Sequence, residues 1–182
     1  MAAIVPPVLI ALVGIAHPAR LTFEDAILWR NLHVVLLPLF PLVALGPWLV
    51  TRSIDRAWGR VSLLLGFVYA CFYSALDVLA GIGAGGLKDA REGGLGVVFG
   101  LAGDLGQVGS VALIGANALA CGCVLRIVGA KGAPGTVLLL AGSYGFMEEH
   151  VYWPGGVLSM LAIAAGWAAL LIALRRAQLP LP

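Results

Sequence analysis

The feature that most constrains this chain is its series of long apolar runs. We place six of them, at residues 2–16, 32–50, 61–82, 95–128, 136–147 and 156–174. In an α-helix, a run of about 20 apolar residues matches the hydrocarbon thickness of a bilayer. Hydrophobic residues make up 61% of the 182 positions and charged residues only 11%, which is too little charge for the surface of a water-soluble domain. The sequence therefore predicts an all-α fold, a polytopic membrane helix bundle.

The number of spans depends on the first run. Residues 2–16 barely reach across a bilayer and contain two prolines, so we expect six transmembrane segments, or five if this run does not span. Pro38, Pro41 and Pro47 lie inside the second run, where proline kinks a helix. No change of composition marks a linker, and residues 1–182 are expected to form a single integral membrane domain.

The basic residues predict an orientation, because cytoplasmic connections carry an excess of Lys and Arg. Seven basic residues fall on one side of the predicted topology: Arg52, Arg56, Arg60, Arg126, Lys131, Arg175 and Arg176. The other side has four, and each pair of them has two acids nearby: Arg20, Arg30, Lys88 and Arg91. We therefore expect a cytoplasmic C-terminus in the plasma (inner) membrane. The net charge of +2 is too small and too dispersed to indicate a nucleic-acid partner.

The remaining ionisable residues collect in the outer half of this topology. The stretch GFMEEHVYWPGG, residues 145–156, sets three ionisable side chains between two apolar runs. An acid at the centre of a spanning helix costs on the order of 2.5–3.5 kcal/mol, so such an acid should face the bundle interior or a wet cavity. We predict that residues 145–156 dip into the outer half of the bilayer and cap Asp77 and Asp104. The candidate catalytic residues are Asp77, Asp104, Glu148, Glu149 and His150.

Polar and aromatic neighbours extend this candidate site. Three of them lie one helical turn from a candidate acid, and a tryptophan follows the acidic stretch. We expect these residues to contact a substrate: Tyr73, Gln107, Tyr144 and Trp153. The two remaining histidines, His17 and His33, are candidate metal ligands, because imidazole binds transition metals. No HExxH or repeated ExxH spacing supports a particular metal, and a haem ligated by histidine also stays open, so no cofactor is identified.

These residue types favour acid–base chemistry. Carboxylates beside histidine act as general acid and base when burial brings their pKa values toward neutrality. The first functional interpretation is therefore a small membrane enzyme or ligand-binding protein with an outward-facing His/carboxylate pocket. Its expected substrate is lipid-like or hydrophobic and enters from the outer leaflet. Whether the chain is an enzyme is left open by the sequence.

Two other functions remain. The first is a non-catalytic subunit of a larger membrane complex or a homo-oligomer, in which the glycines that recur every third residue from 100 to 109 pack against other helices. The same glycines are alternatively explained by a locally broken helix at a ligand site. The second is a proton-coupled transporter, for which the inner half offers only Asp55 as a carboxylate. An exposed loop would also explain Glu148, Glu149 and His150, but it leaves the fifth run short.

Overall fold

The computed structural model describes residues 1–177; residues 178–182 of the expected single domain lie outside this part. Every regular element within residues 1–177 is a helix. In chain order the elements are α1 (Val5–Ile15), α2 (Ala26–Leu36), α3 (Leu39–Val43), α4 (Leu45–Ile54), α5 (Arg56–Leu76), the π-helix η1 (Asp77–Gly83), α6 (Ala84–Asp89), α7 (Leu95–Val128), the 3₁₀ turn η2 (Gly129–Gly132), α8 (Ala133–Glu149) and α9 (Gly155–Arg176). The all-α prediction is confirmed for the described residues.

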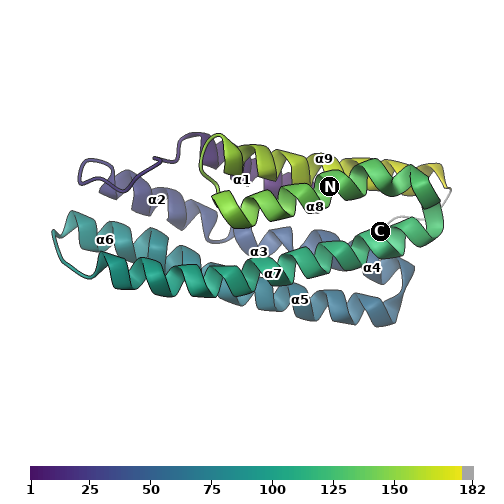
Figure 1. Cartoon of the computed structure of the whole chain (residues 1–182), viewed down its shortest axis with the longest axis horizontal. Coiled ribbons are helices and arrows are strands. Elements are labelled where there is room, and N and C mark those ends of the chain that lie inside the picture. Colours follow the sequence, from purple (N-terminus) through teal and green to yellow (C-terminus); the bar gives the residue numbers. More distant parts are fainter. Residues whose placement is uncertain (178–182) are drawn as a thin grey trace.

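Four helical stretches are long and apolar enough to cross a membrane: Ala26–Ile54, Arg56–Asp89, Leu95–Glu149 and Gly155–Arg176. The third of them turns back at η2, so that α7 and α8 run antiparallel and side by side (Figure 1). α1 packs along α9, but its 11 residues are fewer than one span needs. A bundle with several membrane-compatible helices is therefore present, whereas six spans are not established.

Proline sets the breaks in the first of these stretches, Ala26–Ile54, as predicted. Pro38 stands between α2 and α3, and a second break at Ala44 separates α3 from α4. Pro41 has no N–H to donate to the carbonyl of Leu37, and Pro47 has none for Val43, so the helix cannot continue regularly. α7, in contrast, is one unbroken helix of 34 residues, which excludes the broken-helix interpretation of its glycines.

The glycines of α7 divide between two faces. Gly106 and Gly109 lie against α5: an added Cβ on Gly106 would overlap the side chain of Leu76, and one on Gly109 would come within 3.0 Å of the backbone nitrogen of Tyr73. Gly100 and Gly103 have nothing within 4 Å of an added Cβ. The first pair therefore permits close helix packing, and the second pair faces outward.

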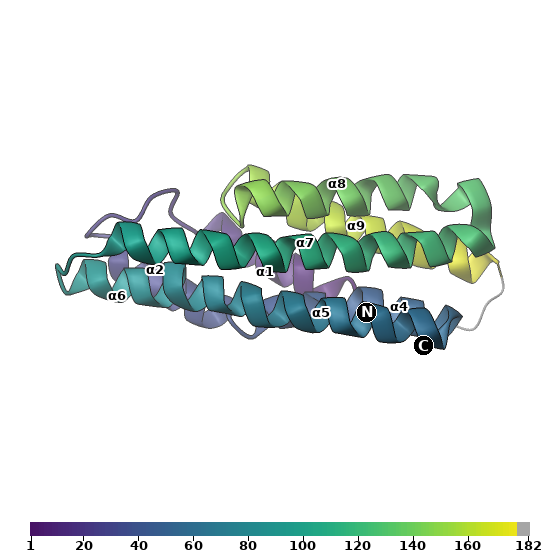
Figure 2. The same cartoon turned by 60° about the horizontal axis from the view of Figure 1, so that its bottom comes forward.

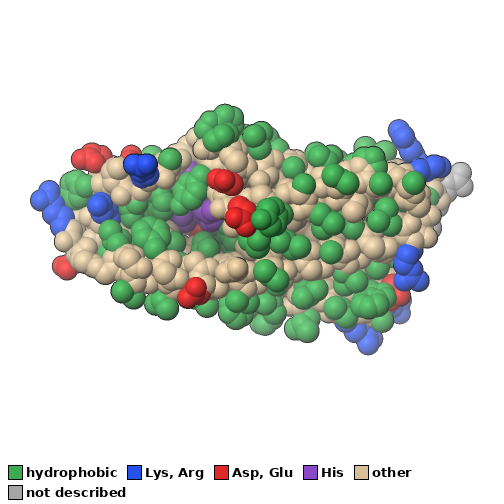
Figure 3. Space-filling model, in the orientation of Figure 1, with side chains coloured by type: hydrophobic (Ala, Val, Ile, Leu, Met, Phe, Trp, Pro, Cys, Tyr) green, Lys and Arg blue, Asp and Glu red, His purple; other side chains and the backbone are tan. Residues whose placement is uncertain are grey.

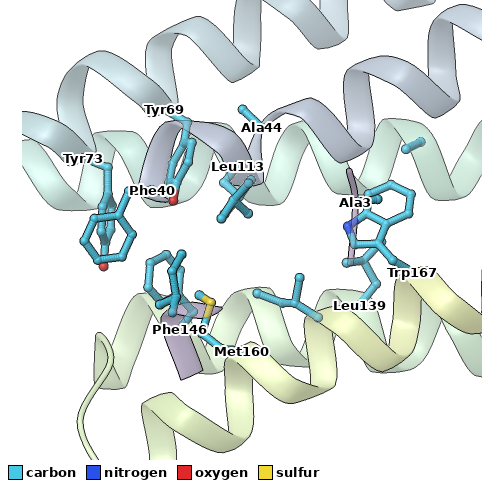
Figure 4. Close-up of a cluster of buried hydrophobic side chains, with 14 of the residues drawn as sticks. Ala3, Phe40, Ala44, Tyr69, Tyr73, Leu113, Leu139, Phe146, Met160 and Trp167 are labelled. Atoms are coloured by element: carbon cyan, nitrogen blue, oxygen red, sulfur yellow. The ribbon is translucent and has the colours of Figure 1, made fainter. Parts of the chain in front are cut away.

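The core runs along the bundle between α5, α7, α8 and α9. Its largest side chains are aromatic and aliphatic, and Figure 4 shows several of them: Phe40, Tyr69, Tyr73, Leu113, Leu139, Phe146, Met160 and Trp167. They are at most 2% exposed. Because lipid is as apolar as these side chains, close packing stabilises such a bundle more than exclusion from water does.

The tightest helix contact predicts a matched pair of variants. An added Cβ on Gly166 of α9 would come within 2.6 Å of the backbone nitrogen of Leu139 on α8, whereas one on Gly122 of α7 meets nothing within 4 Å. Gly166→Ala should lower the free energy of unfolding, measured by SDS titration in detergent micelles, by about 1–3 kcal/mol. Gly122→Ala should leave it unchanged or raise it by up to about 1 kcal/mol. Equal losses in both variants would contradict this packing.

The helices differ in length, and this difference creates the site. At 1.5 Å per residue α7 is about 51 Å long and α8 about 26 Å. In Figures 1 and 2, α2, α6 and the N-terminal part of α7 extend beyond the point where α8 ends. The end of α8 therefore lies partway along the other helices, and the loop that follows it turns into the bundle.

Candidate functional site

Three histidines from separate parts of the chain meet where α8 ends. His17 follows α1, His33 lies on α2 and His150 follows α8. The ring centroids of His17 and His33 are 4.8 Å apart, and the ring of His150 lies 6.3 Å from His17 and 6.1 Å from His33. These are all the histidines of the sequence. His17, His33 and His150 are referred to below as the histidine cluster.

Backbone carbonyls fix the tautomers of two of these histidines. Nδ1 of His17 is 2.8 Å from the carbonyl oxygen of Pro18, and Nδ1 of His33 is 2.7 Å from that of Trp29. A carbonyl oxygen only accepts hydrogen bonds, so each Nδ1 carries a hydrogen and donates it. In a neutral imidazole the other ring nitrogen, Nε2, then holds a lone pair. The two Nε2 atoms face each other at 3.4 Å.

The π-helix η1 shapes the wall against which these rings pack. An added Cβ on Gly81, inside η1, would overlap the ring of His33, so glycine allows the imidazole to lie directly on this backbone. Trp29 donates from Nε1 to the carbonyl oxygen of Ala80 in the same element at 2.9 Å. Its ring also contacts that of His17 edge-on, with centroids 4.6 Å apart. Short π-helical segments of this kind often occur at functional sites.

His150 is turned inward by an unusual backbone conformation. It has φ 51°, a left-handed value that side-chain-bearing residues rarely adopt and that costs on the order of 1–3 kcal/mol. Its Nδ1 lies 2.5 Å from the hydroxyl oxygen of Tyr73 on α5, which holds the ring in place. Glu148 and Glu149, just before it, stay exposed. The backbone conformation of this one strained residue thus separates an inward imidazole from two outward carboxylates.

Asp77 is buried next to this cluster without a partner. Its side chain is 0% exposed, and neither carboxylate oxygen has a hydrogen-bond partner among residues 1–177. Tyr73, which contacts His150, lies four residues before it, and Gly81, which contacts His33, lies four residues after it. All three share one face of α5 and η1. An unsatisfied buried carboxyl between two histidine contacts indicates a functional position.

A cavity of about 310 Å³ opens beside Tyr73 and His150. It lies between α5, α7 and the end of α8, and its lining residues are Tyr73, Leu76, Gly103, Gly106, Gln107, Ser110, Met147, Glu148 and His150. We call it the outer cavity. Figure 3 shows histidine side chains at the floor of a hollow on one face of the molecule, with acidic side chains beside it.

The structure brings together some of the predicted site residues. Four of them line the outer cavity: Tyr73, Gln107, Glu148 and His150. His17 and His33, the candidate metal ligands, lie beside His150, and Asp77 lies on the face of Tyr73. Three residues that the sequence reasoning did not single out also belong here: Trp29, Tyr152 and Ser110. The i, i+4 spacing of Trp29 and His33 is the one sequence signal that links any of them to the cluster.

Other predicted site residues lie on the surface. Asp104, Glu149, Tyr144 and Trp153 are all exposed. Asp104 precedes Gly106 by two residues, which is about 200° around the helix, so it points away from α5 when Gly106 points toward it. The predicted cap over both acids is therefore corrected: Asp77 is enclosed, Asp104 is not, and the inward residue of the cap is His150.

Burial keeps the groups outside the spanning helices uncharged. It lowers the pKa of His17, partly offset by the hydrogen bond to Pro18, and it lowers the pKa of His150 well below its usual value, with the neighbouring His33 and His17 adding to the effect. Burial likewise raises the pKa of Tyr152 to about 12. His17 and His150 are therefore neutral imidazoles at pH 7, able to accept a proton or ligate a metal. Within residues 1–177, no group of three or more His, Cys, Asp or Glu side chains is arranged to hold a metal ion.

Fold and site together define a class: an all-helical bundle of membrane-compatible helices with a histidine cluster, two of whose rings are buried, beside a cavity. Comparison with known proteins gives no match to a family model, a curated protein or a solved structure.

Proposed function

We propose that this chain is an integral membrane protein whose outer cavity binds a lipid-like or otherwise hydrophobic substrate by its polar end. Tyr73 and His150 exchange protons with that end. The observation that carries the proposal is the 2.5 Å hydrogen bond between the Tyr73 hydroxyl and His150 Nδ1 at the cavity wall. A neutral imidazole held by a tyrosine is a suitable general base, and the paired hydroxyl supplies or receives the proton. Gln107 and Glu148 provide further polar contacts.

The charge distribution supports placing this cavity at the outer side of the membrane. Lys and Arg side chains gather at both ends of the molecule (Figure 3), and the larger predicted group includes Arg126 at the end of α7. Gln107 lies on the same straight helix, about 29 Å from Arg126 at 1.5 Å per residue. That is close to the hydrocarbon thickness of about 30 Å. With the Arg126 end in the cytoplasm, the cavity opens at the outer edge of the hydrocarbon.

The surroundings of the cavity support a substrate with an apolar part. On α7, Phe99 is 36% exposed and lies four residues before the cavity-lining Gly103, on the same face of the helix. A molecule whose polar end enters the cavity therefore leaves its tail against apolar side chains and lipid. Exposed apolar surface of this kind is favourable only in contact with hydrocarbon or another apolar partner.

Photoaffinity labelling with a cavity-filling variant tests the proposal. Gly103 lines the cavity and Gly100 does not, and both face open space, so phenylalanine fits at either position without displacing backbone. The purified chain in nanodiscs is labelled with a diazirine-bearing isoprenol and with a diazirine-bearing phosphatidylglycerol. We expect one of the probes to label the peptides around Gln107 and Glu148. Gly103→Phe should reduce that labelling at least tenfold, and Gly100→Phe should not. Labelling that is absent, or equal in both variants, contradicts the proposal.

A second candidate function is that of a non-catalytic subunit, favoured by the outward face of α7. Asp104 is an exposed acid on a membrane-compatible helix, and Gly100 and Gly103 beside it leave room for the backbone of another helix. In that case Gly100→Phe changes the assembly state of the purified protein. A transporter is less favoured, because Asp55 in the inner half caps α5 by accepting from the backbone nitrogens of Ala57 and Trp58.

A further inference from the structure

We propose that Nε2 of His17 and Nε2 of His33 bind one transition-metal ion of the class that takes imidazole ligands in tetrahedral geometry, such as Zn²⁺ or Co²⁺. The inference goes beyond the proposed function, since it requires neither the lipid-like substrate nor proton exchange by His150. Its basis is the geometry of two histidines from different segments of the chain.

The Nε2 lone pairs of His17 and His33 face each other. Both Nδ1 atoms donate to backbone carbonyls, so neither Nε2 carries a hydrogen in the neutral pair. Two acceptors that face each other at 3.4 Å inside a protein are unsatisfied, because neither can donate to the other. Such an arrangement requires a positive species that both nitrogens share, either a proton or a metal ion.

The distance between the two nitrogens bears on which species they share. An N–H···O hydrogen bond has a donor–acceptor distance of about 2.7–3.2 Å. The 3.4 Å between the two nitrogens lies at the long limit for a hydrogen bond. Two nitrogens bound to one tetrahedral metal, each about 2.0–2.1 Å from it, are about 3.3–3.4 Å apart. The spacing therefore fits a tetrahedral metal better than it fits a shared proton.

The rings of His17 and His33 are fixed by contacts with their surroundings. Histidines that ligate metals usually donate their other ring N–H to a carbonyl or carboxylate, which fixes the tautomer and the ring orientation. His17 and His33 both do so, through Pro18 and Trp29. Gly81 gives the ring of His33 a flat backbone surface, and Trp29 packs on the ring of His17. The rings are thus held in the ligating orientation by contacts that do not involve Nε2.

The buried Asp77 carboxylate favours a cation nearby. Asp77 is fully buried with neither oxygen hydrogen-bonded, one helical turn from the glycine that contacts His33. A buried carboxylate without a partner is strongly unfavourable, and a cation nearby offsets that cost. Gly81 links this acid to the histidine pair, because it lies four residues after Asp77 and contacts the ring of His33. Asp77 is an electrostatic partner of the proposed ion and not one of its ligands.

The distances between the rings indicate how many histidines can ligate one ion. Two imidazoles on one tetrahedral ion have ring centroids about 5 Å apart. The 4.8 Å between His17 and His33 fits this value, whereas His150 at 6.1 and 6.3 Å is too far to be a third ligand in the same arrangement. The described part of the chain accordingly shows no group of three ligands. The proposed ion has two protein ligands, one fewer than catalytic zinc sites have, and its remaining positions are available to water or to a substrate atom.

Metal binding to the purified chain tests the proposal. The full chain, with its affinity tag removed and any metal stripped by chelator, is titrated in detergent with Co²⁺, whose absorption reports tetrahedral ligation. Cu²⁺ is then used to count nitrogen ligands by electron paramagnetic resonance. We expect one Co²⁺ per chain and two imidazole nitrogens on Cu²⁺. His17→Gln and His33→Gln should each weaken Co²⁺ binding at least about 100-fold, and His150→Gln should change it by less than about threefold.

The outcomes separate this proposal from the proposed function. The count of two imidazole nitrogens in the parent requires no variant, so a variant that fails to fold does not remove the test. No saturable binding of Co²⁺ or Zn²⁺ at micromolar concentration overturns the site, and so does binding that is unchanged in His17→Gln and His33→Gln. A loss in His150→Gln as large as in the other two overturns the two-ligand assignment. Photoaffinity labelling of the outer cavity is measured on the metal-free chain, so either proposal can fail alone.

Discussion

Acidification from about pH 7.5 to about pH 5.5 is expected to remove the stabilisation that the buried, uncharged His17 and His150 give the folded chain, because burial opposes their protonation. Burial lowers the pKa values of His17 and His150 below 6.5 in the folded state. In the unfolded state both regain a pKa near 6.5, so below that pH the unfolded chain binds more protons. The stabilisation is complete above about pH 6.5 and is lost as the pH falls toward the folded-state pKa values, by about 1.4 kcal/mol per pH unit for each histidine.

SDS titration at a series of pH values, with chelator present, measures this dependence. His150→Gln removes one titrating group, so the loss of stability between about pH 6.5 and pH 5.5 should become smaller by about 1 kcal/mol. Tyr144→Phe, at an exposed position on α8, is the control and should keep the parent slope. A slope that is the same in the parent chain and in His150→Gln would show that His150 is charged in the folded state.

The sequence predicted those features of the fold that depend on the length of the apolar runs and on the positions of the prolines. Long apolar runs must become helices in lipid, since every backbone polar group has to be satisfied within the segment. Pro38 and Pro47 break a helix wherever it lies, so the division into α2, α3 and α4 is also a local property. The π-helix η1 was not predicted, because it depends on the contact of Gly81 with His33, a residue of another helix.

The sequence predicted at which level along the bundle the candidate site residues lie, but not which way their side chains point. Topology placed His17, His33, Asp77, Asp104 and His150 at a similar level, and this level follows from counting residues along helices. Which way each side chain points depends on the neighbouring helices. α7 is apolar on nearly all sides, so its sequence does not mark the face that packs on α5, and Asp104 was assigned to the interior although it is exposed.

His150 shows a second limit of sequence reasoning. It follows two acids, and the three residues form one polar stretch in the sequence. Its left-handed backbone conformation, φ 51°, sends the imidazole to Tyr73 while Glu148 and Glu149 remain outside. Nothing in the residue types favours that conformation, which glycine or asparagine adopts more readily. The contact between His150 and Tyr73, 77 positions apart, therefore required the structure.

Replacing Asp77 by asparagine is expected to stabilise the metal-free chain by about 2 kcal/mol or more, because an unpartnered carboxylate costs several kcal/mol to bury and an amide costs less. The Asp77 side chain is 0% exposed and has no hydrogen-bond partner among the described residues, so the substitution removes a charge and breaks no contact. Residues that reduce stability in this way are commonly kept for function. SDS titration at pH 8 with chelator measures the gain.

The exposed carboxylate on α7 provides the matched control for Asp77→Asn. Asp104→Asn should change the free energy of unfolding by less than about 0.5 kcal/mol, since a surface substitution leaves no buried group unsatisfied. A loss of stability in Asp77→Asn would mean that the carboxylate has a favourable partner in the folded chain, and the electrostatic reason for a cation beside it would fail. A gain in the metal-free chain that disappears when Co²⁺ is bound is the expected result, because the ion at His17 and His33 compensates the charge that asparagine lacks.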